Sequence, residues 1–263
     1  LQAMGINPDL YHCNEGHAAL INLERLAILI QELKLAYTEA SEVVRSTSLF
    51  TTHTPVPAGH DSFTEDMMRI YLSHYAERLK ISWDTLMNLG RATENDHNER
   101  FSMSVFAAKL SQEMNGVSKI HRDVSRKMFN PIWDGYYPQE LHVDSVTNGV
   151  HYFTWTAKRW QNLYKNEFGA NFLTDQSNQD YWRKIQQVSD YAIWEIRQKQ
   201  RKELIDFMKI KINEDLTKRE ENPKLIFQIM ESFNEYALTI GFARRFATYK
   251  RAHLLFKNEA KLA

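Results

Sequence analysis

The stretch LYHCNEGHAAL, residues 10–20, decides the class of fold. Its first four residues, 10–13, predict a short strand, and the Asn-Glu-Gly sequence at residues 14–16 predicts a turn. Apolar residues at helical spacing then predict a helix from about residue 17 to 35. A strand that turns directly into a helix is the building unit of α/β proteins. The sequence therefore predicts an α/β fold.

Further strands and helices follow in the rest of the chain. Short apolar runs predict strands, at residues 48–52, 143–146 and 237–242. Amphipathic patterns predict helices, at residues 65–75, 82–89, 104–114 and 118–128, from about residue 154, and from residue 180 to about 212 as one long helix or two in line. A polar gap at residues 197–202 interrupts the last pattern. The fold is thus expected to be rich in helix.

The composition excludes several classes of function. The chain has 263 residues with 43% hydrophobic content, enough to fill two modest domain cores. Its 33 basic and 33 acidic residues give a formal net charge of zero, so no strong field is present to hold nucleic acid or an acidic membrane surface. The longest largely apolar stretch, residues 18–33, contains charged and amide side chains, so no membrane-spanning segment is expected.

The cysteine content and the first residues bear on location. Cys13 is the single cysteine, which excludes an intrachain disulfide and favours a reducing, cytoplasmic compartment. Neither a basic start nor a small-residue cleavage site precedes residue 17. Leu1 stands as if inside a structural element, and the chain is therefore expected to be a fragment.

A basic cluster lies near the C-terminus, in GFARRFATYKRA at residues 241–252. It comprises Arg244, Arg245, Lys250 and Arg251 and directly follows the strand expected at residues 237–242. Strand ends and the helix starts after them direct backbone N–H groups at anions, and a helix expected to begin near Ala247 would face these cations with its positive dipole end. The cluster therefore predicts a phosphate-type ligand, with a solvated basic helix start as the alternative.

Three polar turns follow the predicted strands, at residues 14–17, 52–55 and 147–149. Their hydroxyl, amide, carboxylate and imidazole groups can hydrogen-bond the hydroxyls of a sugar. Each turn also has a structural interpretation, because Asn-Gly forms turns, Asn or Glu can cap a helix, and a single histidine is often a satisfied structural residue. Their combination favours a carbohydrate ligand.

Other recognisable chemistry is missing from the sequence. The ten histidines form no HxxxH or HExxH pattern and no Cys/His pair on a plausible helix face, so no metal site is expected. A serine nucleophile elbow, a Walker loop and a GxGxxG motif are also absent, which argues against a hydrolase, a P-loop protein and an ordinary dinucleotide-binding protein. Core packing explains most of the tryptophans better than sugar stacking does.

Taken in order, the motifs resemble those of the α-glucan phosphorylases, the pyridoxal-phosphate-dependent glycogen, starch and maltodextrin phosphorylases, in their bacterial form. The resemblance rests on the segments YHCNEGHAAL, FTTHTPVPAGHDSF, MNGVSKIHRDVSRKMF, SVTNGVHYFTW and IGFARRFATYKRA. It covers nearly the whole chain and is weakest at residues 166–236, where helical character alone carries the likeness.

The resemblance implies a fold and a reaction. Members of this family consist of two Rossmann-like domains that face a central cleft, the B-type glycosyltransferase fold. Residues 1–149 would be the C-terminal part of the N-terminal, glucan-side domain, and residues 150–263 the incomplete start of the C-terminal, cofactor-side domain. Such enzymes cleave a terminal α-1,4-linked glucose from a glucan with inorganic phosphate, release glucose 1-phosphate, and often form homodimers.

The resemblance also implies roles for four residues of the polar turns. His53 matches the histidine that meets the glucosyl unit through its backbone and side chain. Asn148 matches an asparagine that binds a glucose hydroxyl. Glu15 and His17 match the acidic and histidine positions that line the cleft near the glucan.

The resemblance also implies that the basic cluster binds two anions. Arg245 and Lys250 match the pair that grips the substrate phosphate, and Arg244 takes the basic position next to the phosphate of pyridoxal phosphate, while Arg251 is expected to be structural. The lysine that forms the Schiff base with this cofactor would lie beyond Ala263. The 263-residue chain alone is therefore expected to bind no cofactor covalently and to be inactive.

Two other functions remain open at the level of sequence. The chain could be a non-catalytic glycan-binding or scaffold piece that keeps the cleft loops. It could also belong to a nucleotide-sugar glycosyltransferase of the related two-domain fold, in which Arg245 and Lys250 would hold a diphosphate.

Overall fold

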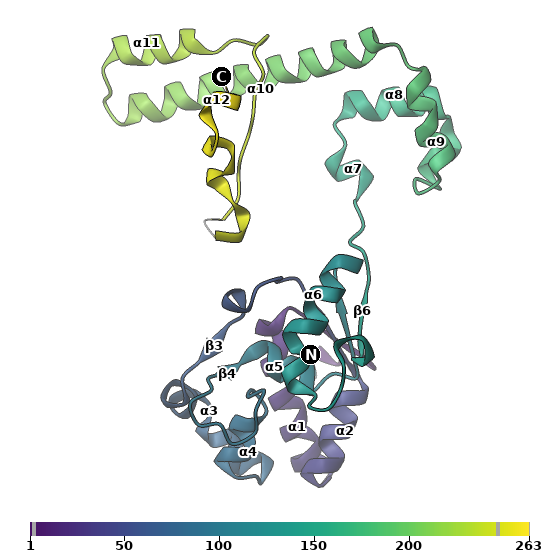
Figure 1. Cartoon of the computed structure of the whole chain (residues 1–263), viewed down its shortest axis with the longest axis vertical. Helices are drawn as coiled ribbons and strands as arrows, with labels where there is room; N and C mark the ends of the chain where they lie inside the picture. Colours follow the sequence, from purple (N-terminus) through teal and green to yellow (C-terminus); the bar gives the residue numbers. More distant parts are fainter. Residues whose placement is uncertain (2–3, 246–247, 263) are drawn as a thin grey trace. The chain divides into compact units, whose positions relative to one another are not determined.

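Four parallel strands form the sheet on which the first half of the chain is built (Figure 1). The computed structural model describes residues 1, 4–245 and 248–262. Contacts divide the chain into unit 1, Leu1–Gly149, and unit 2, Val150–Ala263.

The sheet of unit 1 contains the strands in their order along the chain, β1 (Tyr11–Asn14), β2 (Ser48–Thr52), β5 (Glu113–Gly116) and β6 (Val143–Ser145). In the register of the sheet Cys13 lies beside Phe50, Phe50 beside Met114, and Met114 beside Val143. All four side chains are at most 3% exposed, so they form a continuous apolar row across the sheet. Because every strand runs the same way, all four carboxyl ends lie at one edge.

Helices pack around this sheet, and their sequence patterns explain their places. They are the 3₁₀-helix Gly16–Leu20, α1 (Ile21–Glu32), α2 (Tyr37–Ser46), α3 (Glu65–Leu79), α4 (Trp83–Asn88), α5 (Met103–Lys109) and α6 (Lys119–Phe129). On α1 the buried residues Leu23, Leu26, Ala27 and Ile30 recur at helical spacing and form one apolar stripe. A serine or threonine hydroxyl caps four of the helices, α3, α4, α5 and α6.

A short antiparallel pair joins two loops of unit 1. Its strands are β3 (Ser62–Phe63) and β4 (Phe101–Ser102). The backbone N–H of Met103 also donates to the carbonyl of Asp61 at 3.0 Å. The pair therefore fixes the end of the loop that follows β2 beside the start of α5.

The helix expected at residues 104–114 is wrong in its second half. The helix α5 ends at Lys109, and Glu113–Gly116 forms β5, which pairs with β2 on one side and with β6 on the other. The Asn115-Gly116 pair belongs to this strand. A Cβ atom on Gly116 would lie 2.9 Å from the backbone nitrogen of Arg122, so glycine is required here by the close approach of α6.

All regular elements in the described residues of unit 2 are helices. They are α7 (Tyr152–Trp155), α8 (Lys158–Phe168), α9 (Gln179–Arg183), α10 (Asp190–Lys218), α11 (Pro223–Ser232) and α12 (Glu259–Leu262), with 3₁₀-helices at Ala170–Leu173, Lys184–Gln187, Thr248–Lys250 and Ala252–Phe256. Tyr152, Phe168 and Phe172 form a small aromatic core. The helices α10 and α11 lie side by side (Figure 1).

The pattern at residues 180–212, expected as one long helix or two in line, divides before residue 190. The polar gap at residues 197–202 lies inside the uninterrupted helix α10. The break falls instead before α10, where the Ser189 hydroxyl accepts from the backbone N–H of Ala192 and begins a new helix. None of the helices in the described residues combines the length and apolar character that a membrane crossing requires.

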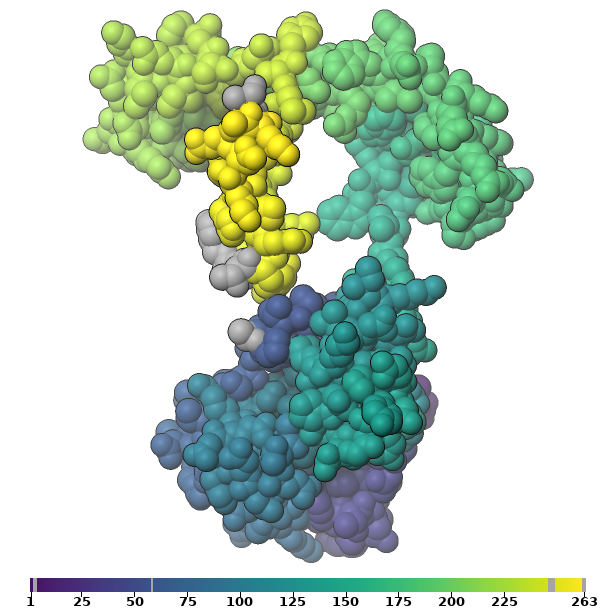
Figure 2. Space-filling view, viewed as in Figure 1, coloured from purple at the N-terminus to yellow at the C-terminus, as the bar shows by residue number. Residues whose placement is uncertain are grey.

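The strand predicted at residues 237–242 is wrong. These residues form no regular element, and residues 237–245 are exposed; by the colour bar they belong to the yellow-green to yellow part of the surface in Figure 2. A strand needs hydrogen bonds from a neighbouring strand, and the described residues of unit 2 contain none. The helix start expected near Ala247 lies outside the described residues, and Thr248–Lys250 is a single 3₁₀ turn.

Candidate functional site

The carboxyl ends of the parallel strands bring together turns from distant parts of unit 1. Glu15 follows β1, His53 follows β2, and Asn148 lies three residues after the end of β6. The backbone N–H of Asn148 donates to the carbonyl of Val117, which follows β5, at 3.2 Å. This edge is where α/β sheets present ligands.

Glu15 connects the first two turns. Its Oε2 atom accepts from the backbone N–H of His53 at 2.9 Å and from the hydroxyl of Thr54 at 3.0 Å. Its Oε1 atom accepts from the backbone N–H of Gly16 at 3.3 Å. One carboxylate thus holds the residue after β1 and the residues after β2 in a fixed arrangement.

The backbone of Glu15 is strained. Its φ of 70° and ψ of 163° lie in a region that is normally open only to glycine. Such a conformation costs about 1–3 kcal/mol and persists only where the surroundings hold it. Here the backbone N–H of Glu15 donates to the carbonyl of Thr51 at 2.8 Å, and the three bonds to the carboxylate hold the side chain.

His53 is exposed and its ring is oriented by a neighbour. The Nε2 atom lies 2.6 Å from the amide oxygen of Asn14. Because this oxygen only accepts, Nε2 carries the proton, and the Nδ1 atom of the neutral ring is left as an acceptor. The imidazole can therefore accept a hydrogen bond from a ligand hydroxyl.

A series of hydrogen-bonded side chains, which the sequence did not indicate, connects neighbouring strands near their carboxyl ends. The hydroxyl of Thr51 donates to the amide oxygen of Asn115 at 2.8 Å, so it accepts from Nε2 of His12, also at 2.8 Å. These three residues come from β1, β2 and β5. Thr51 and Asn115 are buried inside strands, where a threonine and an asparagine give no functional signal in a single sequence.

Gly16 allows the first turn to lie directly against α5. A Cβ atom at this position would be 2.6 Å from the Oγ atom of Ser104 and 2.9 Å from its backbone nitrogen.

The structure thus joins Glu15 and His53 through hydrogen bonds, while His17 and Asn148 lie exposed at the same sheet edge.

The basic cluster lies in unit 2. Arg244 and Arg245 are exposed, and the ammonium of Lys250 lies 4.4 Å from the ring centre of Tyr249. Hydrogen bonding to Lys250, followed by the charges of Lys250 and Arg245, lowers the pKa of the Tyr249 phenol. No acidic side chain of the described residues pairs with Arg244, Arg245, Lys250 or Arg251, a charge arrangement that suits an anionic ligand.

The described residues offer no cluster of three histidine, cysteine, aspartate or glutamate side chains that could hold a metal ion. The groups available at the sheet edge are instead a carboxylate, an imidazole and amides, which are suited to hydrogen bonding with neutral hydroxyls.

Fold and site together define an α/β protein whose sheet edge carries groups able to hydrogen-bond hydroxyls. The chain belongs to the carbohydrate phosphorylase family, whose model matches residues 8–254.

Relatives with curated names match this chain along nearly its whole length. It is 37% identical over 263 residues to the maltodextrin phosphorylase of Thermococcus litoralis, covering 100% of this chain and 30% of that protein. It is 36% identical over 261 residues to the glycogen phosphorylase of Mycobacterium tuberculosis, covering 97% of this chain and 30% of that protein. The glycogen phosphorylase of Aquifex aeolicus is 30% identical over 262 residues, covering 100% of this chain and 37% of that protein. The chain thus spans about a third of the length of these relatives.

Proposed function

We propose that the full-length protein is an α-glucan phosphorylase, a glycosyltransferase that moves a terminal α-1,4-linked glucose onto inorganic phosphate and releases glucose 1-phosphate. The observation that carries the proposal is the hydrogen-bonded edge of Glu15 and His53 in a chain whose relatives are named maltodextrin and glycogen phosphorylase.

His53 would meet the glucosyl unit. Its backbone N–H is already bound by Glu15, so its carbonyl and the Nδ1 atom remain to accept from sugar hydroxyls. Asn148 would bind a glucose hydroxyl through its exposed amide, and Glu15 and His17 would line the cleft near the glucan. Because Glu15 fixes the backbone of His53, it would also preorganise this contact before the sugar binds.

The basic cluster would hold two phosphate groups. Arg245 and Lys250 would bind the substrate phosphate, and Arg244 would bind the phosphate of pyridoxal phosphate, which supplies an ionisable phosphate group beside the substrate when it is bound. Two neighbouring dianions repel each other, and fixed cations offset this repulsion. The exposed guanidinium groups without acidic partners in the described residues fit this requirement.

The two units would correspond to two domains of a B-type glycosyltransferase fold. Residues 1–149 would form the C-terminal part of the glucan-side domain, and residues 150–263 the start of the cofactor-side domain. We also propose that the full-length protein is cytoplasmic and forms a homodimer. The cytoplasmic location is supported by Cys13, which is buried and unpaired.

Lys250→Ala in the full-length protein tests the phosphate assignment. Loss of one fixed charge at the reacting phosphate costs about 3 kcal/mol of transition-state stabilisation, so we expect kcat/KM for phosphate to fall more than about 100-fold. Arg251→Ala is the matched control, because this neighbouring cation is assigned no ligand, and it should change kcat/KM little. Unchanged phosphorolysis in Lys250→Ala would refute the role of Lys250.

The same assay separates the alternative functions. Release of glucose 1-phosphate from a glucan and phosphate, without a sugar nucleotide, supports the phosphorylase. Activity only with a sugar nucleotide would show a nucleotide-sugar glycosyltransferase, and glucan binding without turnover would show a scaffold.

A further inference from the structure

Several buried polar atoms of unit 1 lie without a hydrogen-bond partner in the described part of the chain, and four of them belong to residues on or near α6. These four are Oγ1 of Thr52, Nε2 of His60, Nε2 of His121 and Oγ of Ser125. Thr52 and Ser125 are 0% exposed and His121 is 7% exposed. Buried polar groups in native proteins nearly always have a partner, either in the protein or in an ordered water molecule.

The residues that carry these four atoms lie on α6 or near it. His121, Ser125 and Phe129 are spaced four residues apart and so share one face of this helix. The ring of His60 meets Phe129 edge-on with 5.6 Å between the ring centres. Thr52 lies beside Gly116 in the sheet, and a Cβ atom on Gly116 would be 2.9 Å from Nδ1 of His121. These residues therefore mark a region between α6 and the ends of β2 and β5.

The hydrogen bonds of the two histidines define what their free nitrogens can do. The Nδ1 atom of His121 accepts from the backbone N–H of Val117 at 3.2 Å, so Nε2 of the neutral ring carries the proton and donates. The Nδ1 atom of His60 lies 2.6 Å from the hydroxyl of Ser104. Burial, as the largest cause, lowers the pKa of His60 and favours its neutral ring. When Nδ1 of His60 donates to Ser104, its Nε2 accepts.

We propose that a water molecule is bound among Thr52, His60, His121 and Ser125. A buried water typically makes about three hydrogen bonds, and it both donates and accepts. The donor on His121, an acceptor on His60 and two rotatable hydroxyls match these requirements. A metal ion fits less well, because the described residues contain no third histidine, cysteine or carboxylate ligand at the site.

The position of this water has a consequence for the loop of residues 53–60. Thr52 directly precedes His53, and His60 lies near the other end of the loop, so the water fixes both ends of the loop to α6. His60 and His121 are then positioning residues for His53. The water site is independent of the proposed function, whereas its effect on turnover rests on that function.

A high-resolution crystal structure of the full-length protein is the direct test. We expect a water oxygen within hydrogen-bonding distance of at least three of the four atoms. A dry site, or one filled by a side chain or another group, would overturn the proposal.

Two asparagine variants test the effect on the loop. In His121→Asn the amide can still accept from the backbone N–H of Val117 but has no group at the place of Nε2. In His60→Asn the amide can still bond to Ser104 but not to the water. We expect amide hydrogen exchange at residues 53–59 to become about five- to tenfold faster in each, the equivalent of roughly one lost hydrogen bond. His60→Gln, which reaches the place of Nε2, should restore most of the protection.

Turnover provides the functional measurement. We expect kcat for glucan phosphorolysis to fall in the asparagine variants and to recover in His60→Gln, with an unchanged KM for phosphate, whose proposed site is in unit 2. Wild-type exchange at residues 53–59 in both asparagine variants would refute the positioning role. A wild-type protein without phosphorolysis would refute the proposed function alone, because the crystal and exchange measurements do not depend on it.

Discussion

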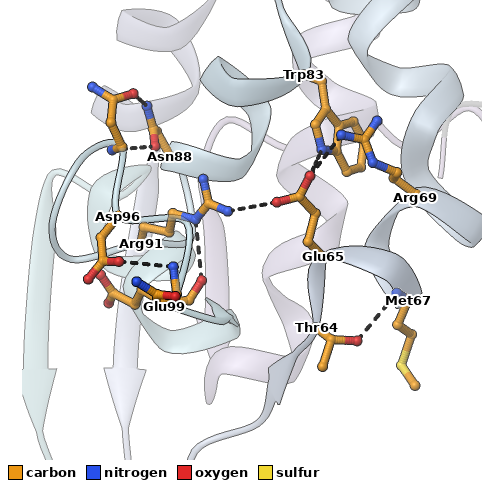
Figure 3. Close-up of polar contacts among 11 residues, drawn as sticks. Thr64, Glu65, Met67, Arg69, Trp83, Asn88, Arg91, Asp96 and Glu99 are labelled. Atoms are coloured by element: carbon orange, nitrogen blue, oxygen red, sulfur yellow. Dashed lines mark hydrogen bonds and ion pairs between the residues drawn. The ribbon is translucent and has the colours of Figure 1, made fainter.

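Glu65→Ala is expected to destabilise unit 1 by about 3–5 kcal/mol, because it leaves a buried positive charge without a counterion. Arg91 is 0% exposed, and its Nη2 atom donates to Oε2 of Glu65 at 3.0 Å (Figure 3). Its Nε atom donates to the carbonyl of Glu99 at 3.3 Å, and Nη1 has no partner in the described residues. The carboxylate of Glu65 is therefore the one acidic group paired with this guanidinium in that part of the chain.

The two partners of this ion pair are not equivalent. The side chain of Glu65 is 29% exposed and also accepts from Nε1 of Trp83 at 2.9 Å and from Arg69 at 2.8 Å. The hydrogen bond from Trp83 is the largest of the effects that lower the pKa of Glu65, followed by that from Arg69. Removing Arg91 therefore leaves Glu65 solvated and paired, and Arg91→Met should cost only about 1–3 kcal/mol.

Hydrogen exchange measured by mass spectrometry is the suitable assay, since a chain of two units need not unfold in one step. Peptides covering residues 62–110 report the opening of the loops that Arg91 connects. We expect Glu65→Ala to lose more protection there than Arg91→Met does, and the double variant to lose less than Glu65→Ala alone. If Arg91→Met is as destabilising as Glu65→Ala, or if the double variant is the worst, the unpaired charge is not the main cost.

Two further predictions follow from unit 1. The hydrogen bond from Arg78, with that from Tyr75, lowers the pKa of Glu24 from 4.5 to about 2, so its stabilising contribution is complete above pH 4.5 and is lost as the pH falls toward 2. In urea unfolding, Glu24→Gln should therefore be less stable than wild type at pH 7 and equal to it near pH 2. The difference at pH 7 should be about 1 kcal/mol or less, because the carboxylate is 46% exposed. A difference that persists at pH 2 would contradict the assignment. Gly16→Ala should lower the free energy of unfolding by about 1–3 kcal/mol, because the new Cβ atom would overlap Ser104. Gly149→Ala is the control, since a Cβ atom there would have no atom within 4 Å, and this variant should unfold at nearly the wild-type urea concentration.

The sequence predicted elements well where local signals suffice. The strand expected at residues 48–52 is β2, and the turn at residues 14–16 does lead from a strand into helical structure. Glu113–Gly116 was missed because it becomes a strand only through two neighbours, each more than twenty residues away in the sequence. Residues 237–242 show the opposite case, since an apolar run of strand type forms no strand without a partner.

The site was predictable by residue type but not by its contacts. Polar turns after predicted strands point to Glu15 and His53, and the structure joins these residues across 38 positions of sequence through a carboxylate and a backbone N–H. Nothing local indicates that the rings of His60 and His121 lie near the same face of α6, because histidine is found both at surfaces and in interiors. The roles of Arg244, Arg245 and Lys250 stay predictions that rest on the family.

The backbone of Glu15 has a consequence for protein engineering. Selection of variants for stability alone rewards the release of strain, and glycine is the residue that adopts φ 70° and ψ 163° most easily. Glu15→Gly would release this strain and would at the same time release the backbone N–H of His53 and the hydroxyl of Thr54 from their shared acceptor. At this position a relaxed backbone and an ordered sheet edge are therefore opposing goals.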